Sequence, residues 1–282
     1  MRALFAGLLV LLPFSAFAHQ PVQDMAPRWS DGWGLQVRQE YRASDKVLSG
    51  SSEVQNPLGR RDRVSKTWFE GVYTFQRAVR VTAKIPWIHQ TRVTSTGIRQ
   101  TGEGFGDLIL AVPLKRYWND KGETGAWGVT PNLRLPTGGT SDDYPVGDGS
   151  YDLGLSLTYV RETPRIYVYA DLFYWLNGSG RRGMNRGNDV GLDINLGLHP
   201  YHNNSNDTGL FVMWDVSVRY EGRGTSTVGT TGGKRVSTGP IAIVYWRNWM
   251  LRAEYALPAY EKVLGTQVSR GAGLTLSLGV AF

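Results

Sequence analysis

Apolar and polar residues alternate along the last segment of the chain. One parity carries the apolar set, Leu274, Leu276, Leu278, Val280 and Phe282, and the other carries Thr275, Ser277, Gly279 and Ala281. Successive side chains of an extended strand point to opposite faces of a sheet, so the pattern predicts a strand with one apolar face and one polar face. A soluble sandwich strand alternates in the same way, so the case for a membrane barrel depends on repetition of the pattern.

The same alternation recurs along the chain. We count twelve segments, at residues 30–42, 63–77, 79–92, 104–117, 125–136, 150–161, 165–177, 188–199, 208–220, 235–246, 248–260 and 269–282. An even number of strands is what a closed up-and-down barrel in the outer membrane requires. We therefore predict an all-β fold, a closed antiparallel transmembrane barrel of about 12 strands.

The connections between these segments alternate in length. Five connections are short, at residues 76–78, 119–124, 163–164, 201–207 and 247–248. The other connections are mostly longer and rich in Gly, Ser, Thr and charged residues, at 43–62, 93–103, 137–149, 178–187, 221–234 and 261–268. Outer membrane barrels have short periplasmic turns and long external loops. This order predicts that both termini lie in the periplasm.

Aromatic residues cluster at the predicted strand ends. The set beside the short turns is Trp33, Phe75, Trp118, Trp127, Tyr159, Trp246, Trp249 and Phe282, and a looser set beside the long loops is Tyr41, Trp87, Tyr151 and Tyr255. Amphipathic rings prefer the headgroup level of a bilayer, where barrels carry girdles of them. The expected partners are outer membrane lipid and, through the terminal Phe282, the barrel-assembly machinery.

If the apolar parity of each strand faces lipid, the other parity faces an enclosed lumen. The candidate lumen and selectivity residues are Arg38, Glu40, Glu70, Arg80, Lys84, Asp107, Arg134, Asp171, Asp193, Asp215, Arg219, Arg252 and Glu254. Each such charge would cost several kcal/mol near the midplane of the lipid face, so their confinement to one parity supports the assignment. Two interpretations stay open: a narrow passage whose charges set its selectivity, or a packed polar interior that only stabilises the barrel.

One strand differs from the others. Its inward parity is an aromatic strip, Tyr167, Tyr169, Phe173 and Trp175, around Asp171, and we expect Phe105 and Phe211 to point inward as well. Such walls could stack a flat apolar or aromatic solute, or they could fill space.

The first residues have the pattern of a cleavable export signal. Arg2 precedes an apolar stretch from Leu4 to Leu12, and Ala16-Phe17-Ala18 is a small-residue cleavage motif. We therefore expect a signal peptide at 1–18 and one barrel domain at 19–282. No later apolar run is long enough for a membrane helix. The chain has no cysteine, and its net charge of +7 is spread along the sequence, so we expect no disulfides and no nucleic-acid partner.

Catalytic and metal-binding patterns are scarce. His89 has no serine two positions along its strand, as an outer membrane phospholipase would have, and His199 leads into a turn, so we interpret His89, His199 and His202 as interface histidines. Asp142, Asp143 and Asp148 share one loop, but their spacing does not match the helix-loop-helix calcium motif. We expect no catalytic residues, no metal and no cofactor.

Three short motifs resemble a known family. The motifs are Phe105-Gly-Asp-Leu108, Leu133-Arg-Leu-Pro-Thr-Gly138 and Val146-Gly-Asp-Gly-Ser-Tyr-Asp-Leu-Gly154, and they occur with a Phe-terminated last strand. Together they are similar to the outer membrane transporter family of the meta-cleavage phenol degradation pathway. That family is distantly similar to channels for fatty acids and aromatic hydrocarbons. The resemblance implies passive uptake of small hydrophobic or aromatic molecules through the bacterial outer membrane. The alternatives are a sealed structural or surface-binding barrel and a phospholipase-like hydrolase.

Overall fold

The structure, a computed structural model, describes residues 30–120, 123–139, 143–203, 205–226 and 229–282. The expected signal peptide at 1–18 lies outside these residues. Among the described residues, no helix is long and apolar enough to cross a membrane.

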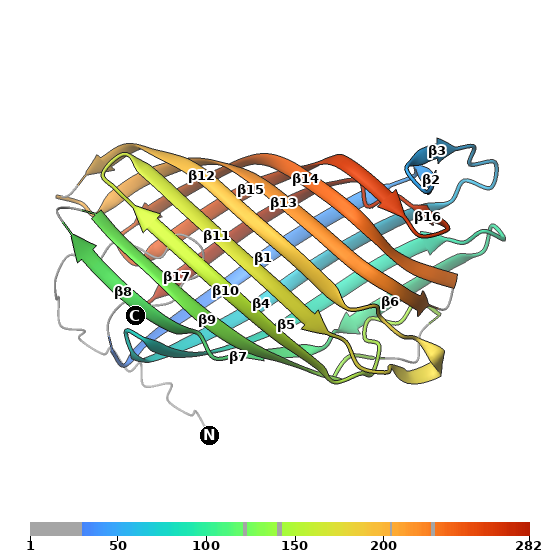
Figure 1. Cartoon of the computed structure of the whole chain (residues 1–282), viewed down its shortest axis with the longest axis horizontal. Coiled ribbons are helices and arrows are strands. Elements are labelled where there is room, and N and C mark those ends of the chain that lie inside the picture. Colours follow the sequence, from blue (N-terminus) through green and yellow to red (C-terminus); the bar gives the residue numbers. More distant parts are fainter. Residues whose placement is uncertain (1–29, 121–122, 140–142, 204, 227–228) are drawn as a thin grey trace, which may run out of the picture.

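The described strands form a closed antiparallel barrel with twelve positions around its wall, which confirms the predicted fold class (Figure 1). Eleven positions are single strands: β1 (Gly32–Ser44), β4 (Arg61–Gln76), β5 (Val79–Val93), β9 (Glu123–Leu135), β10 (Asp152–Glu162), β11 (Ile166–Leu176), β12 (Asp189–Asn203), β13 (Thr208–Ser226), β14 (Gly229–Trp246), β15 (Trp249–Val263) and β17 (Ala272–Ala281). The barrel closes between β17 and β1, where Trp33 and Phe282 exchange backbone hydrogen bonds of 2.7 and 2.8 Å. Closure removes the free sheet edges that a bilayer cannot solvate.

The remaining wall position is built from three short strands. The segment at 104–117, predicted as one strand, is divided among β6 (Arg99–Phe105), β7 (Leu108–Ala111) and β8 (Leu114–Asp120). The break between β6 and β7 places Gly106 and Asp107 on the inner side in succession, because a Cβ on Gly106 would meet the inward Pro86 and Ile88, and Asp107 lines the same cavity as Ile88. An extra residue of this kind reverses the alternation of the strand before it.

This reversal makes the prediction for Phe105 wrong. The ring of Phe105 is 49% exposed and packs edge-on against Trp87 with 4.8 Å between ring centroids, on the outer face of the barrel. Strict alternation along an unbroken strand would place Phe105 on the same inner side as Asp107, two residues later.

Several predicted loops are strands. The β5–β6 hairpin continues through most of residues 93–103, and the β13–β14 pair extends through most of 221–234. A small sheet of β2 (Val47–Ser49), β3 (Ser52–Val54) and β16 (Thr266–Val268) lies at the same end of the barrel (Figure 1). These segments show little alternation of apolar and polar residues. Backbone hydrogen bonds alone can pair two strands, so segments beyond the lipid-facing band do not need an apolar side.

The outward parity forms the apolar surface that a transmembrane barrel needs. Leu155, Leu157 and Leu278 are about half exposed in the isolated chain, as are most outward side chains of the other strands. The aromatic set predicted beside the short turns lies on this face, with Trp118 against Tyr159 and Trp246 stacked on Trp249. The second predicted set, Tyr41, Trp87, Tyr151 and Tyr255, is also outward and exposed. Two aromatic belts therefore flank the apolar band.

Candidate functional site

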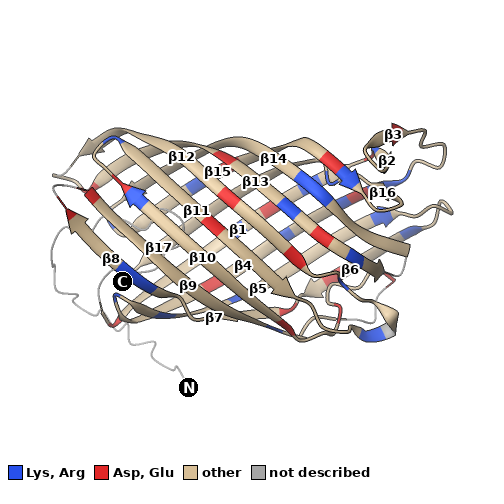
Figure 2. Cartoon of the chain, in the orientation of Figure 1, with Lys and Arg blue, Asp and Glu red and all other residues tan. Residues whose placement is uncertain are grey.

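The lumen holds the inward charges of the strands, and charged residues of both signs follow the strands along the barrel (Figure 2). Glu70 on β4 contacts cations from both neighbouring strands: Oε1 lies 2.8 Å from Nη2 of Arg38 on β1, and Oε2 lies 3.2 Å from Nζ of Lys84 on β5. Glu40 lies 3.6 Å from Nε of Arg38. Four of the sequence-selected residues are thus brought together in one charge chain across three strands.

Five more of the selected residues, with Asp152, form three further pairs. The N–O distance is 2.7 Å in each pair: Arg134 with Asp152, Arg219 with Asp193, and Arg252 with Glu254. Asp152, the partner of Arg134, is not in the candidate set. Because opposite charges are adjacent, most of the inward charge is internally compensated.

The other selected residues have neutral or aromatic partners. Asp215 accepts a hydrogen bond from the Asn195 side-chain amide, and Asp171 accepts one of 2.7 Å from the Thr158 hydroxyl. Asp107 accepts a backbone hydrogen bond of 2.9 Å from Gly138, and the guanidinium of Arg80 lies 5.8 Å from the Tyr117 ring centroid. All thirteen selected charges therefore lie on the inner side of the wall.

The aromatic strip of β11 is divided between two environments. The guanidinium of Arg219 lies 4.1 Å from the ring centroid of Phe173, and that of Arg134 lies 4.4 Å from that of Trp175. Tyr167 is buried against Phe211, and Tyr169 packs at the margin of the same cluster. Cation–π contacts occupy one face of each ring in the first pair, so this half of the strip is not a bare stacking platform.

An apolar cluster inside the barrel was missed by the sequence analysis. It lies toward the short-turn end and consists of Tyr167, Phe211, Met213, Ile241, Ile243, Tyr245, Met250 and Ala281. The signal was present: residues 210–214 and 241–245 are apolar at both parities, as expected for strands whose two faces are both removed from water. The lumen is therefore apolar on one side near this end.

His199 and His202 belong to this cluster, which corrects their interpretation as interface residues. The His199 ring stacks on Phe211 with 4.0 Å between centroids, and the Tyr245 hydroxyl lies 2.6 Å from Nδ1 of His202 and 3.2 Å from Nε2 of His199. His199 keeps the inward parity of Asp193 and Asn195, and the break in register between Leu198 and Tyr201 brings His202 to the same side. His89 is outward and exposed, 3.4 Å from Glu103.

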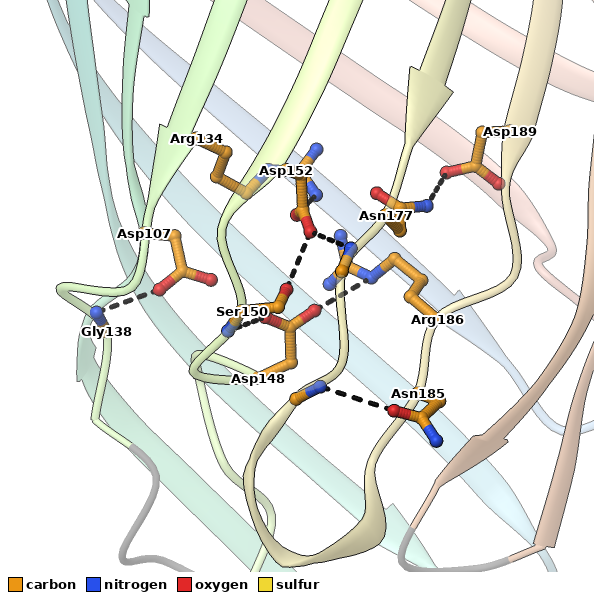
Figure 3. A network of polar contacts seen from close by, with 12 residues as sticks. Asp107, Arg134, Gly138, Asp148, Ser150, Asp152, Asn177, Asn185, Arg186 and Asp189 are labelled. Atoms are coloured by element: carbon orange, nitrogen blue, oxygen red, sulfur yellow. Dashed lines mark hydrogen bonds and ion pairs between the residues drawn. The ribbon is translucent and has the colours of Figure 1, made fainter.

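Two loops at the opposite end fold onto the lumen. The segment between β9 and β10 carries Asp148, and the segment between β11 and β12 carries Arg186, whose Nε lies 3.4 Å from Oδ2 of Asp148 (Figure 3). Burial opposes the charge of Arg186, but Asp148, Asp152, Asp189 and Glu221 outweigh burial and raise the pKa of Arg186 above its ordinary value. The Ser150 hydroxyl donates to Asp152, so the network joins both loops to the wall.

Tyr144 fixes the first of these loops to the wall. Its hydroxyl donates to Asp62 on β4 at 3.2 Å, the Arg92 guanidinium lies 4.0 Å from its ring centroid, and its carbonyl accepts from the Gln90 amide at 3.1 Å. A Cβ at Gly102 would lie 1.7 Å from this carbonyl oxygen, so only glycine allows the approach. The pKa of Tyr144 is raised by burial and by the charge of Asp62.

The interior contains cavities. One of about 500 Å³ lies under the two loops and is lined by Lys66, Trp68, Ile88, Tyr144 and Arg186 among others. A second of about 250 Å³ lies toward the short turns, between Glu70, Arg80 and Lys84 on one side and Tyr169 and Asp171 on the other. A third of about 240 Å³ lies beside Glu40, Arg42 and Arg270.

The structure offers no cluster of three or more potential metal ligands within its described residues. Asp142 lies outside them. Asp148 accepts hydrogen bonds from the backbone and hydroxyl of Ser150 and faces Arg186. The carboxylate of Asp148 therefore has partners that a calcium ion would have to displace.

Comparisons with known proteins agree with the barrel. The model of the family described as "Putative MetA-pathway of phenol degradation" matches residues 38–257. No curated protein matches the chain. An outer membrane channel from Pseudomonas putida F1 is similar in fold, with a TM-score of 0.74 at 13% identity over 96% of this chain and 100% of that one. The toluene transporter TodX from Pseudomonas putida has a TM-score of 0.36 at 12% identity over 89% of this chain and 88% of that one.

Proposed function

The chain belongs to the family whose model describes a pathway of phenol degradation, and from this membership and the hollow, polar lumen we propose an outer membrane channel for passive uptake of small apolar or aromatic molecules. In this proposal the barrel spans the bacterial outer membrane, the short turns and both termini face the periplasm, and the assembly machinery recognises Phe282. The paired charges and the β11 aromatic residues form the filter.

The observation that carries the proposal is the presence of cavities in the interior. A sealed structural barrel would fill its lumen with side chains, whereas this lumen has a cavity at the long-loop end and another toward the short turns. The cavity of about 500 Å³ at the long-loop end has the volume of a small-molecule binding site. Both cavities are also lined by apolar residues, which an apolar or aromatic solute could contact.

Purified protein in planar bilayers and in vesicles that contain lipopolysaccharide tests the proposal. We expect single-channel conductance and faster uptake of benzyl alcohol than by vesicles without protein. Heat-denatured protein is the control for leakage. Folded protein that gives neither conductance nor uptake would support the sealed barrel instead.

A second candidate function has one specific observation in its favour. The register places Ser65 on β4 opposite His89 on β5, and His89 opposite Glu103 on β6, so a hydroxyl, an imidazole and a carboxylate form a row on the outer face. A serine hydrolase uses these three groups in this order. The serine partner that the sequence analysis did not find on the strand of His89 is thus supplied by its neighbour.

Other contacts weigh against hydrolysis. The Ser65 hydroxyl accepts a hydrogen bond of 2.8 Å from the Gln39 amide. Among the described residues, no hydrogen bond links the Ser65 hydroxyl to His89. A nucleophile must be within reach of its base. Release of fatty acid from phospholipid that disappears in both Ser65→Ala and His89→Ala would establish the enzyme, and absence of turnover in the unaltered protein would remove it.

A further inference from the structure

Three cations in the half of the lumen nearest the long loops have no ion-pair partner among the residues that the structure describes, unlike the paired charges described above. Arg42 on β1, Lys66 on β4 and Arg270 just before β17 come from three adjacent positions of the wall. Arg42 lies against Gly273, since a Cβ there would be 3.1 Å from its Cγ, and Lys66 is in register with Glu40, two residues before Arg42. Within the described part of the chain, none of the three side chains forms an ion pair or donates a hydrogen bond.

The carboxylates of this region have other partners. Glu40 lies 3.6 Å from Arg38, Glu254 lies 2.7 Å from Arg252, and Glu261 accepts from the Ser269 hydroxyl and the Arg270 backbone. Glu261 also lies 3.6 Å from Arg235. Glu40, Asp62 and Glu221 attract the three cations without direct contact, so within the described residues these cations lack the direct ion pairs found elsewhere in the lumen.

The cations also act on one another. Arg42 and Arg270 both oppose the charge of Lys66, and repulsion by Arg42 is the largest of the effects, ahead of burial, that lower the pKa of Arg270 to about 9. Like charges held together in a partly enclosed space have an unfavourable energy that an anion between them would relieve. The barrel wall and loops surround the three side chains, but part of the surface of each remains accessible to solvent, so an anion in the lumen can reach them.

An apolar wall adjoins this cluster. Lys66 lines the cavity of about 500 Å³ together with Trp68, Ile88 and Ile109, whereas Arg42 and Arg270 line the cavity of about 240 Å³. Lys66 and Trp68 are two residues apart on one face of β4, a spacing of about 7 Å, which is the scale of one aromatic ring. The Arg38 guanidinium lies 5.3 Å from the Trp68 ring centroid and contributes to the same wall, and Trp68 Nε1 is buried without a hydrogen-bond acceptor among the described residues.

We propose that Arg42, Lys66 and Arg270 bind the carboxylate of a small organic acid whose apolar or aromatic body lies against Trp68, Ile88 and Ile109. This proposal rests on the proposed function and specifies its substrate class as an organic anion. The paired charges elsewhere in the lumen then provide a polar passage without a second strong anion site.

Equilibrium dialysis of the detergent-solubilised protein with radiolabelled benzoate tests the site without requiring conductance. Benzoate should bind, and Lys66→Gln and Arg42→Gln should each weaken binding about tenfold or more, which corresponds to about 1.4 kcal/mol. Lys66→Arg should retain binding. Arg161→Gln removes an outward cation paired with Glu123 at 2.7 Å and is the matched control, with affinity unchanged.

Two competitors separate the parts of the ligand. Excess acetate should displace benzoate poorly, because it lacks the apolar body, and neutral benzyl alcohol should displace it poorly, because it lacks the charge. Circular dichroism and heat-dependent gel mobility verify that each variant is folded. Benzoate binding that survives in folded Lys66→Gln and Arg42→Gln, or equal displacement by benzyl alcohol, would overturn the site.

Bilayer recordings distinguish this failure from failure of the channel. In a salt gradient the unaltered protein should favour anions, and Lys66→Gln should shift the reversal potential toward cations. Conductance without this shift, together with no benzoate binding, would leave the channel and reject the anion site. Benzoate binding without any conductance would keep the site and reject the channel.

Discussion

At the scale of single residues, ion pairs stabilise the lumen, and two of them, Glu70 with Lys84 and Arg134 with Asp152, join residues in direct register on neighbouring strands. Arg134 of β9 is opposite Asp152 of β10, and Asp152 is fully buried, accepting from Arg134, from Ser150 and from the Gly178 backbone. A buried carboxylate with several donors is favourable only while its cation is present. Exposed pairs on the outer rim are not subject to this dependence.

Arg134→Met should therefore destabilise the barrel strongly. It leaves the Asp152 charge buried without its cation, which costs about 3–5 kcal/mol. Arg161→Gln, at the exposed pair with Glu123, should cost about 1 kcal/mol or less. Urea unfolding in lipid vesicles measures both changes, and equal losses in the two variants would contradict the role of the buried pair.

At the scale of elements, the segment between β9 and β10 is held against the wall by a close backbone approach. The Tyr144 carbonyl lies over Gly102 of β6, and the Tyr144 hydroxyl reaches Asp62 of β4. The segment narrows the lumen at the long-loop end because both contacts lie on the inner side. Its position is therefore set by strands far away in the sequence.

Gly102→Ala should release this segment. The new methyl group would lie 1.7 Å from the Tyr144 carbonyl oxygen, so the backbone must withdraw from the wall. We expect a higher single-channel conductance and faster proteinase K cleavage of the segment between β9 and β10, with little change in the unfolding midpoint of the barrel. Gly139→Ala, whose methyl group would make an ordinary contact of 3.6 Å with Val146, is the control. Unchanged conductance and cleavage in folded Gly102→Ala would show that the segment does not narrow the passage.

The docking of Tyr144 should also depend on pH. Its pKa is raised in the folded protein by burial and by Asp62, so the docked state holds the phenolic proton more tightly than the undocked state does. Docking is then fully stable below the ordinary tyrosine pKa of about 10 and weakens as the pH rises above it. Conductance recorded from about pH 8 to about pH 11 should increase at the alkaline end, and Tyr144→Phe should abolish this increase.

At the scale of the whole molecule, the barrel has an apolar outer surface and a charged inner one, separated by a single layer of backbone. Each strand contributes to both surfaces because its side chains alternate. Closure between β1 and β17 makes the partition complete around the wall. A charge on the outer surface should therefore be costly in proportion to its depth in the bilayer.

Two substitutions in β10 test this partition. Leu157 is in the middle of the strand and Leu153 is near its long-loop end, and both are outward and about half exposed. Leu157→Arg should cost about 2–4 kcal/mol of unfolding free energy in vesicles, and Leu153→Arg about 1 kcal/mol or less. If both variants lose the same stability, or neither does, the apolar band does not lie at the depth that the barrel assigns to it.

The sequence alone determined the features that depend on neighbours along one strand. Alternation identified the barrel, the even number of strands and the inward position of all the selected charges, because the two-residue period of a strand is local. Only the tertiary structure decided the rest. The Gly106–Asp107 irregularity reversed Phe105, the β12 register change turned His202 inward, and the contacts of Tyr144 and Arg186 brought two loops onto the lumen. These features depend on which residues of distant strands meet, and strand pairing, unlike alternation, leaves no periodic signal in a single sequence.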